Sequence, residues 1–89
     1  MAILITYDIP SKHEEFKKEM FAKGYKDRIP EDKCKILYFP ETTLYHSTKT
    51  AVTARDEALS ICSSLGISLE RCVATLWTDW AAICGEQYK

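Results

Sequence analysis

The 89-residue sequence has few of the features that usually reveal a function. It has four cysteines but no C-x-x-C pair, so neither a zinc site nor a redox dithiol is indicated. Its three glycines are scattered, which excludes a glycine-rich phosphate loop. No apolar run approaches the roughly 18 residues that a membrane-spanning helix needs. We therefore expect one small domain, residues 1–89, with no membrane partner.

A net charge of either sign is also nearly absent: the basic and acidic residues almost cancel, and the net charge is −1. A near-neutral chain has no overall attraction to nucleic acid. Basic residues gather mildly over residues 12–35, which is typical of a solvated helix face. We expect no signal peptide, and we interpret the cysteines as buried, reduced thiols of a cytoplasmic protein. These are Cys34, Cys62, Cys72 and Cys84.

The sequence does contain a clear order of elements. Apolar, β-branched runs predict four strands, near residues 2–8, 34–39, 43–47 and 71–77. The first run is nearly unbroken, which favours a strand buried on both faces. An apolar stripe from Ala51 to Leu65 predicts a helix over 50–65. A second helix is expected over 12–23, with the polar stretch 25–33 as a loop.

Local signals suggest where these helices begin and end. Ser11 and Glu14 have the spacing of a capping box, and Thr50 or Ser47 could cap the second helix. Gly24 and Gly66 are expected to terminate the two helices in the left-handed conformation.

The order β-α-β-β-α-β predicts a ferredoxin-like α+β sandwich, with a four-stranded antiparallel sheet and both helices on one face. The other face would be left open and would carry large apolar residues. We therefore expect a homodimer that buries more than about 1,000 Å² in total. Residues 78–89 are ambiguous: they could be a loop, a further strand over 81–84, or a dimer contact.

Asp8 stands where the first strand meets Pro10 and the start of a helix. Two interpretations are open. Asp8 could shape the turn by accepting hydrogen bonds. Alternatively, it could be displayed at the end of the strand and hold Mg²⁺ together with the same carboxylate of a dimer mate. We expect Asp8 to be solvent-accessible at the carboxyl end of the strand, because Pro10 and Ser11 turn the chain there.

The stretch "ILITYDIP" resembles the opening of the CRISPR-associated protein two family, whose first strand ends in Tyr-Asp-Ile. It is also similar to the VapD toxins and to the ribonuclease antitoxin GhoS, which share that fold. The resemblance implies a small ferredoxin-like homodimer. In the catalytic members, a first-strand aspartate from each protomer is thought to hold a metal for phosphodiester cleavage, and only Asp8 carries that role over. Glu14 and Glu15 stand where the family usually has basic residues early in the first helix, flanked by Lys12, Lys17 and Lys18. The family's second-strand pattern is absent, and "CKILYFPE" stands there.

Three further candidates have ordinary structural alternatives. His46 begins an H-x-T pattern, but the second motif of two-histidine phosphoesterases is missing, so His46 is a sheet residue or a general base beside Asp8. Asp79 could be a second carboxylate or could form a turn. The aromatics could stack on single-stranded RNA or pack in a core or dimer interface. They are Tyr38, Phe39, Tyr45, Trp77 and Trp80.

Two functional hypotheses follow. The first is a homodimeric binding module, such as a toxin–antitoxin-type protein, with no cofactor. The second is a Mg²⁺-dependent endoribonuclease that uses Asp8 from each protomer, with RNA as its partner.

Overall fold

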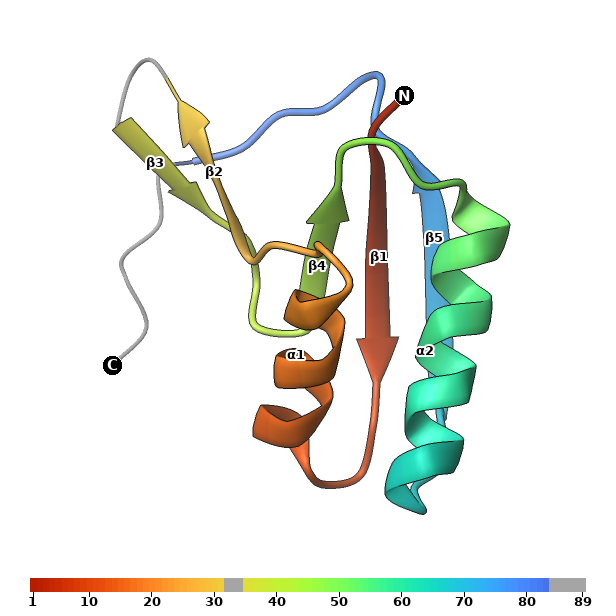
Figure 1. Cartoon of the computed structure of the whole chain (residues 1–89). Coiled ribbons are helices and arrows are strands. Elements are labelled where there is room, and N and C mark those ends of the chain that lie inside the picture. Colours follow the sequence, from red (N-terminus) through yellow and green to blue (C-terminus); the bar gives the residue numbers. More distant parts are fainter. Residues whose placement is uncertain (32–34, 84–89) are drawn as a thin grey trace.

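The protein is an α+β fold built on a three-stranded antiparallel sheet (Figure 1). The computed structural model describes residues 1–31 and 35–83. β1 lies between β4 and β5, with Ile5 opposite Leu44 on one side and Ala74 on the other. The elements are β1 (Ile3–Asp8), α1 (His13–Ala22), β2 (Arg28–Glu31), β3 (Lys35–Tyr38), β4 (Thr43–His46), α2 (Ala51–Leu65) and β5 (Arg71–Leu76).

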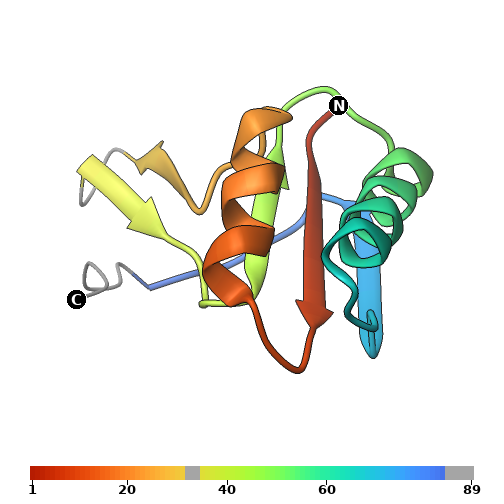
Figure 2. The same ribbon diagram turned by 60° about the horizontal axis from the view of Figure 1, so that its bottom comes forward.

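Both helices cover the same face of the sheet, as Figures 1 and 2 show. Odd-numbered residues of β1 point toward them because side chains alternate along a strand. The core joins this row to one face of each helix, so both helices are held by burial of apolar surface. Its buried residues are Ile3, Ile5, Tyr7, Ile9, Phe16, Met20, Tyr25, Leu44, Ala54, Ala58, Ile61 and Cys62.

The expected four-stranded sheet is wrong. The predicted strand 34–39 does not join the sheet; its described part forms β3, which pairs with β2 in a separate two-stranded sheet. Lys26 takes the position beside β4 instead, through two 2.8 Å backbone hydrogen bonds with Tyr45. One residue therefore fills the edge where a full strand was expected, and the following chain turns away into the β2–β3 hairpin.

β2 itself was missed because Pro30 lies in its middle, and proline cannot donate to a ladder. The register explains why it is tolerated. The Phe39 N–H donates to the Asp27 carbonyl at 2.9 Å, and pairs bonded in this way alternate along an antiparallel ladder. Pro30, opposite Ile36, therefore falls at a position where no ladder donor is needed.

The helix termini follow the sequence in three places out of four. The Thr50 hydroxyl accepts from the Thr53 N–H at 3.1 Å, so the predicted cap of α2 is confirmed. Gly24 and Gly66 both adopt positive φ, at 93° and 73°. The capping box is wrong: the N-cap of α1 is Lys12, with φ 58°, and no side chain caps the helix. The Lys12 ammonium instead donates to the Leu65 carbonyl at 2.9 Å, at the end of α2.

No helix in the described ranges has the length and apolar character required to cross a membrane.

Candidate functional site

Asp8 lies at the carboxyl end of β1, and its side chain is 49% exposed, as expected. Its Oδ2 accepts a hydrogen bond from Arg71 Nε at 2.6 Å across the β1–β5 ladder. Neither interpretation of Asp8 included this partner: one had the turn after β1 supply the donors, and the other had a metal ion at the carboxylate. The pair raises the pKa of Arg71, through the hydrogen bond first and the carboxylate charge second. The Arg71 guanidinium, whose side chain is 75% exposed, thus occupies Oδ2 of the carboxylate that a metal ion would need.

The structure does not bring the other sequence candidates to Asp8. His46 lies opposite Ile3, five residues back along β1, or roughly 17 Å at strand spacing. Asp79 follows Trp77, whose N–H bonds to Ala2, so it too lies beyond the opposite end of β1. Within residues 1–31 and 35–83, no group of three or more histidine, cysteine or acidic residues could hold a metal ion.

His46 belongs to a polar cluster on the helix side of the sheet. Its Nδ1 accepts from the N–H groups of Thr48 and Lys49, at 3.1 and 3.2 Å. Burial lowers its pKa below the ordinary value, and the charge of Lys49 acts in the same direction. A neutral ring that already accepts two backbone hydrogen bonds orders the turn into α2, which fits the interpretation of His46 as a sheet residue.

Glu57 links this cluster to the end of α1. It accepts from Tyr25 at 2.8 Å and from Lys49 at 2.6 Å, and Lys23 stands 3.8 Å away. Burial would raise the pKa of Glu57, but the hydrogen bonds from Lys49 and Tyr25 outweigh it and hold that pKa low. The contacts of Glu57 therefore join α2 to the end of α1 and to the turn that follows β4.

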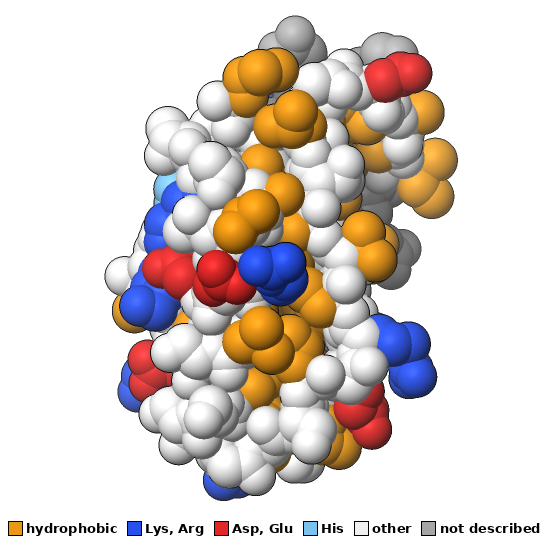
Figure 3. All heavy atoms as spheres, turned by 90° about the vertical axis from the view of Figure 1, so that its right-hand side faces the viewer, with side chains coloured by type: hydrophobic (Ala, Val, Ile, Leu, Met, Phe, Trp, Pro, Cys, Tyr) orange, Lys and Arg blue, Asp and Glu red, His pale blue; other side chains and the backbone are white. Residues whose placement is uncertain are grey.

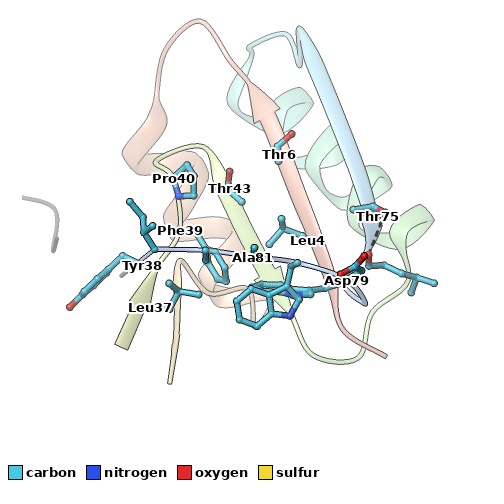
Figure 4. Close-up of a pocket in the computed structure, with 15 residues that line it drawn as sticks. Leu4, Thr6, Leu37, Tyr38, Phe39, Pro40, Thr43, Thr75, Asp79 and Ala81 are labelled. Atoms are coloured by element: carbon cyan, nitrogen blue, oxygen red, sulfur yellow. Dashed lines mark hydrogen bonds between the residues drawn. The ribbon is translucent and has the colours of Figure 1, made fainter. Parts of the chain in front are cut away.

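A cavity of about 620 Å³ lies on the other face of the sheet, away from the helices. Its floor includes Leu4, Thr6 and Thr43, from β1 and β4. Figure 4 shows residues of the hairpin, Leu37 to Phe39, on one side and Thr75 with Asp79 on the other. Residues 77–83 complete the wall. The open sheet face is thus partly covered by two segments of the same chain, and they leave a hollow.

Aromatic rings contribute to that wall through Tyr38, Phe39, Trp77 and Trp80. Phe39 and Trp77 also contact Tyr45 of β4, and the ring centroids of these three residues are 5.0 to 6.2 Å apart. Trp80 stands edge-on to Trp77 at 4.6 Å. Edge-on pairs of this kind are favourable, at about 0.5–1.5 kcal/mol each beyond burial. Four of the five aromatics singled out from the sequence therefore pack together, and Trp80 remains 48% exposed beside the hollow.

The cavity carries little charge. Among the described residues that line it, Asp79 is the only acidic or basic one. Polar groups come otherwise from Tyr38 and from threonine hydroxyls such as Thr75, which donates to the Leu76 carbonyl at 3.4 Å. The sequence pointed to Asp79 as a second carboxylate or as a turn residue. Its place in an apolar cavity depends on how the hairpin and residues 77–83 fold over the sheet, which no local pattern reveals.

Two of the four cysteines lie in the described part of the chain. Cys62 is buried and Cys72 is partly buried, both are free thiols, and burial raises the pKa of each. Buried, reduced thiols were expected; Cys62 fits this expectation, and Cys72 is only partly buried. Cys34, Cys84 and the rest of residues 84–89 lie outside the described residues, and so does the end of the possible strand 81–84; residues 81–83 are not in a strand.

Comparisons with protein-family models, with curated proteins and with solved structures find no match to this chain. The likeness to the CRISPR-associated protein two family therefore rests on Tyr7, Asp8 and Ile9 and on the order of elements.

Proposed function

We propose that this protein is a binding module whose site is the cavity on the open face of the sheet. The cavity itself supports this proposal: about 620 Å³, walled by aromatic and aliphatic side chains, with few polar groups. Small-molecule sites have typical volumes of roughly 300–1,000 Å³ and the same mixture of linings. Because Asp79 is the only charged residue among the described lining, the ligand is an apolar molecule with one cationic group.

Two forces would act on such a ligand. Its apolar body would bury surface against Leu37 and Phe39, at about 25 cal/mol per Å². Its cation would pair with the Asp79 carboxylate and lie near the rings of Trp77 and Trp80, which attract positive charge. An anionic ligand of equal shape would face Asp79 with no basic side chain among the described lining to offset the repulsion. This charge pattern also disfavours RNA as the occupant, since phosphates need basic partners.

The test uses the chain's own fluorescence, because both of its tryptophans line the cavity. Phenylbutylamine, phenylbutanol and phenylbutyric acid share one skeleton and differ in charge. We expect the amine to bind most tightly and the acid most weakly. Asp79→Asn should remove the preference for the amine over the alcohol, and Asp56→Asn, on the outer side of α2, should keep it. If none of the three changes the fluorescence at millimolar concentration, the proposal fails.

The second candidate is the Mg²⁺-dependent endoribonuclease, and the exposure of Asp8 at the end of β1 favours it. The ion pair with Arg71 opposes it, because the guanidinium competes with a metal for the carboxylate. The assay is cleavage of single-stranded RNA with Mg²⁺ or Mn²⁺. This activity should be lost in Asp8→Asn and should rise in Arg71→Ala. Intact RNA with the wild-type protein across pH 6 to 9 would eliminate this candidate.

A further inference from the structure

The outer edge of β5 is a free edge of the described sheet. The strand order is β4-β1-β5, and no described residue forms a ladder with the side of β5 that faces away from β1. Natural edge strands are usually protected by proline, by lysine or by a bulge. β5, with the sequence RCVATL, contains neither proline nor lysine and pairs with β1 in an unbroken register. Its one charged residue, Arg71, stands at the first position and bonds to Asp8 of β1. A six-residue strand of this kind is a template for another strand.

The hydrogen-bond pattern shows which backbone groups of β5 are available. The Trp77 N–H donates to the Ala2 carbonyl at 3.0 Å, and the Tyr7 N–H donates to Thr42, on the β4 side, at 3.1 Å. Even-numbered residues of β1 therefore bond toward β5, and they meet odd-numbered residues there. It follows that the backbone groups of Cys72, Ala74 and Leu76 point away from the sheet.

Exposed apolar side chains accompany this edge. On β5, Val73 is 64% and Leu76 is 52% exposed. On α2, which packs on β5, Val52 and Leu59 are 58% and 49% exposed; they are seven residues apart and so lie on one side of the helix. Figure 3 shows apolar side chains running along this side of the molecule, with charged groups between them. We call these four residues and the strand the β5 edge.

We propose that a second copy of this chain binds at the β5 edge, with the two β5 strands paired antiparallel about a two-fold axis at Ala74. In that register Ala74 pairs with Ala74 of the partner subunit, and Cys72 pairs with Leu76 of the partner subunit. Every outward N–H and C=O of β5 is then bonded. The product is one continuous six-stranded sheet with both α2 helices on the same face.

A second copy fits this surface better than a peptide strand does. A peptide would satisfy the backbone of β5 but would leave Val52 and Leu59 in water. A copy related by a two-fold axis brings its own α2 alongside, and Leu59 lies near the middle of that helix, where the two helices would meet. Such self-matching is what an interface between identical subunits requires. It also places the expected homodimer contact at the sheet edge rather than on the sheet face, which the hairpin and residues 77–83 partly cover.

The sharpest variant is Ala74→Pro, because proline at this position removes only an outward N–H and leaves the β1–β5 ladder its donors. The paired strands lose two hydrogen bonds. We therefore expect the dissociation constant of the dimer, measured by sedimentation equilibrium, to rise about ten- to hundred-fold. Leu59→Lys should weaken the dimer as well. Phe21→Lys is the matched control: Phe21 is 42% exposed but lies on α1, and its variant should dimerise like the wild type.

A cross-link tests the register directly. Val73 would stand opposite Thr75 of the partner subunit in a pair without hydrogen bonds, where Cα atoms are about 4.5 Å apart and a disulfide can form. The double variant Val73→Cys, Thr75→Cys should give a covalent dimer, with the 73–75 link identified by mass spectrometry. Should Ala74→Pro fail to fold by circular dichroism, Leu59→Lys and the cross-link still decide. A wild-type monomer at 100 micromolar, or a dimer that Leu59→Lys leaves intact and that forms no 73–75 link, would overturn the proposal.

Discussion

The two faces of the sheet differ in how they are packed. On the helix side of β1, Ile3 and Ile5 have no exposed surface and Tyr7 is 3% exposed. On the other side, Leu4 is partly buried and Thr6 is exposed. The described residues that lie over this side belong to the hairpin and to residues 77–83, and they surround a cavity. One face of β1 thus packs in the core, and its other face borders the cavity. We expect substitutions on the helix side to change stability and substitutions around the cavity to change binding.

The strongest test of this difference is Phe16→Ala. Phe16 is fully buried, and its ring lies 4.5 Å from that of Tyr7. Truncating a buried phenylalanine leaves a hole in a packed core and costs about 3–5 kcal/mol of unfolding free energy. A domain of this size has little stability to spare, so we expect Phe16→Ala to be largely unfolded at 25 °C. Urea denaturation followed by circular dichroism measures the effect.

The matched substitution on the cavity face is Trp80→Ala. Because Trp80 is half exposed, we expect a loss of stability below that of Phe16→Ala by at least about 2 kcal/mol. The same variant should weaken binding of phenylbutylamine. If Trp80→Ala unfolds the protein as completely as Phe16→Ala does, the two faces are not distinct, and residues 77–83 belong to the core.

A smaller effect is expected within the helical layer, where the two N-termini differ. Thr50→Ala removes a side chain that accepts from the Thr53 N–H, and loss of such a cap costs about 1 kcal/mol. Ser11→Ala should cost close to nothing, since Lys12 is the N-cap of α1 and no side chain caps it. Equal losses for the two variants, measured by thermal unfolding, would restore the capping box that the sequence suggests.

That pair of variants illustrates what sequence reasoning could reach. Both helices and the strands β1, β4 and β5 follow from local periodicity, and Thr50 and Gly66 mark the ends of α2 as predicted. The prediction of a fourth strand in the sheet was wrong because segments far apart in the chain compete to pair with the same sheet edge. Lys26 bonds to Tyr45 and takes the edge, and nothing in the run "CKILYF" records that competition.

The site was harder to predict for the same reason. The exposure of Asp8 follows from its position before Pro10, but its bond to Arg71 depends on the register between β1 and β5. The distance between His46 and Asp8 follows from the same register. The cavity needs the hairpin and residues 77–83 to fold over one face of the sheet. Its only early signal was the high aromatic content of residues 38–45 and 77–80.

The next prediction concerns how stability depends on pH, through a histidine on the helix side of the sheet. His46 has a lowered pKa in the folded protein, so between that pKa and its ordinary value of 6.5 the unfolded chain binds more protons. Stability should therefore be full above about pH 6.5 and should fall as the pH drops below it. The physical causes are the burial of the ring and then the charge of Lys49, both of which disfavour the protonated form. A proton on Nδ1 would also break the hydrogen bonds from Thr48 and Lys49. Because the ring is partly exposed, we expect a smaller effect than that of Thr50→Ala.

The measurement is urea unfolding at several pH values between 7.5 and 5. His46→Gln should flatten the dependence on pH over this range. His13→Gln, the matched control at the exposed start of α1, should keep the slope of the wild type. A slope that survives in His46→Gln and vanishes in His13→Gln would show that the titrating group lies outside the cluster around Glu57.

The smallest effect is expected on the cavity face, from Trp77→Phe. The Trp77 Nε1 is shielded from solvent and has no hydrogen-bond partner among the described residues, and such an unsatisfied donor costs about 1–3 kcal/mol. Phenylalanine removes that donor and keeps a ring near Phe39 and Tyr45, while it loses the apolar surface of the second ring. The two terms oppose each other, so we expect a net change within about 0.5 kcal/mol, by urea denaturation, where a truncation on the helix side costs several. A loss above about 1.5 kcal/mol would mean that the indole N–H has a partner, and that the wall of the cavity is packed as strictly as the core beneath the helices.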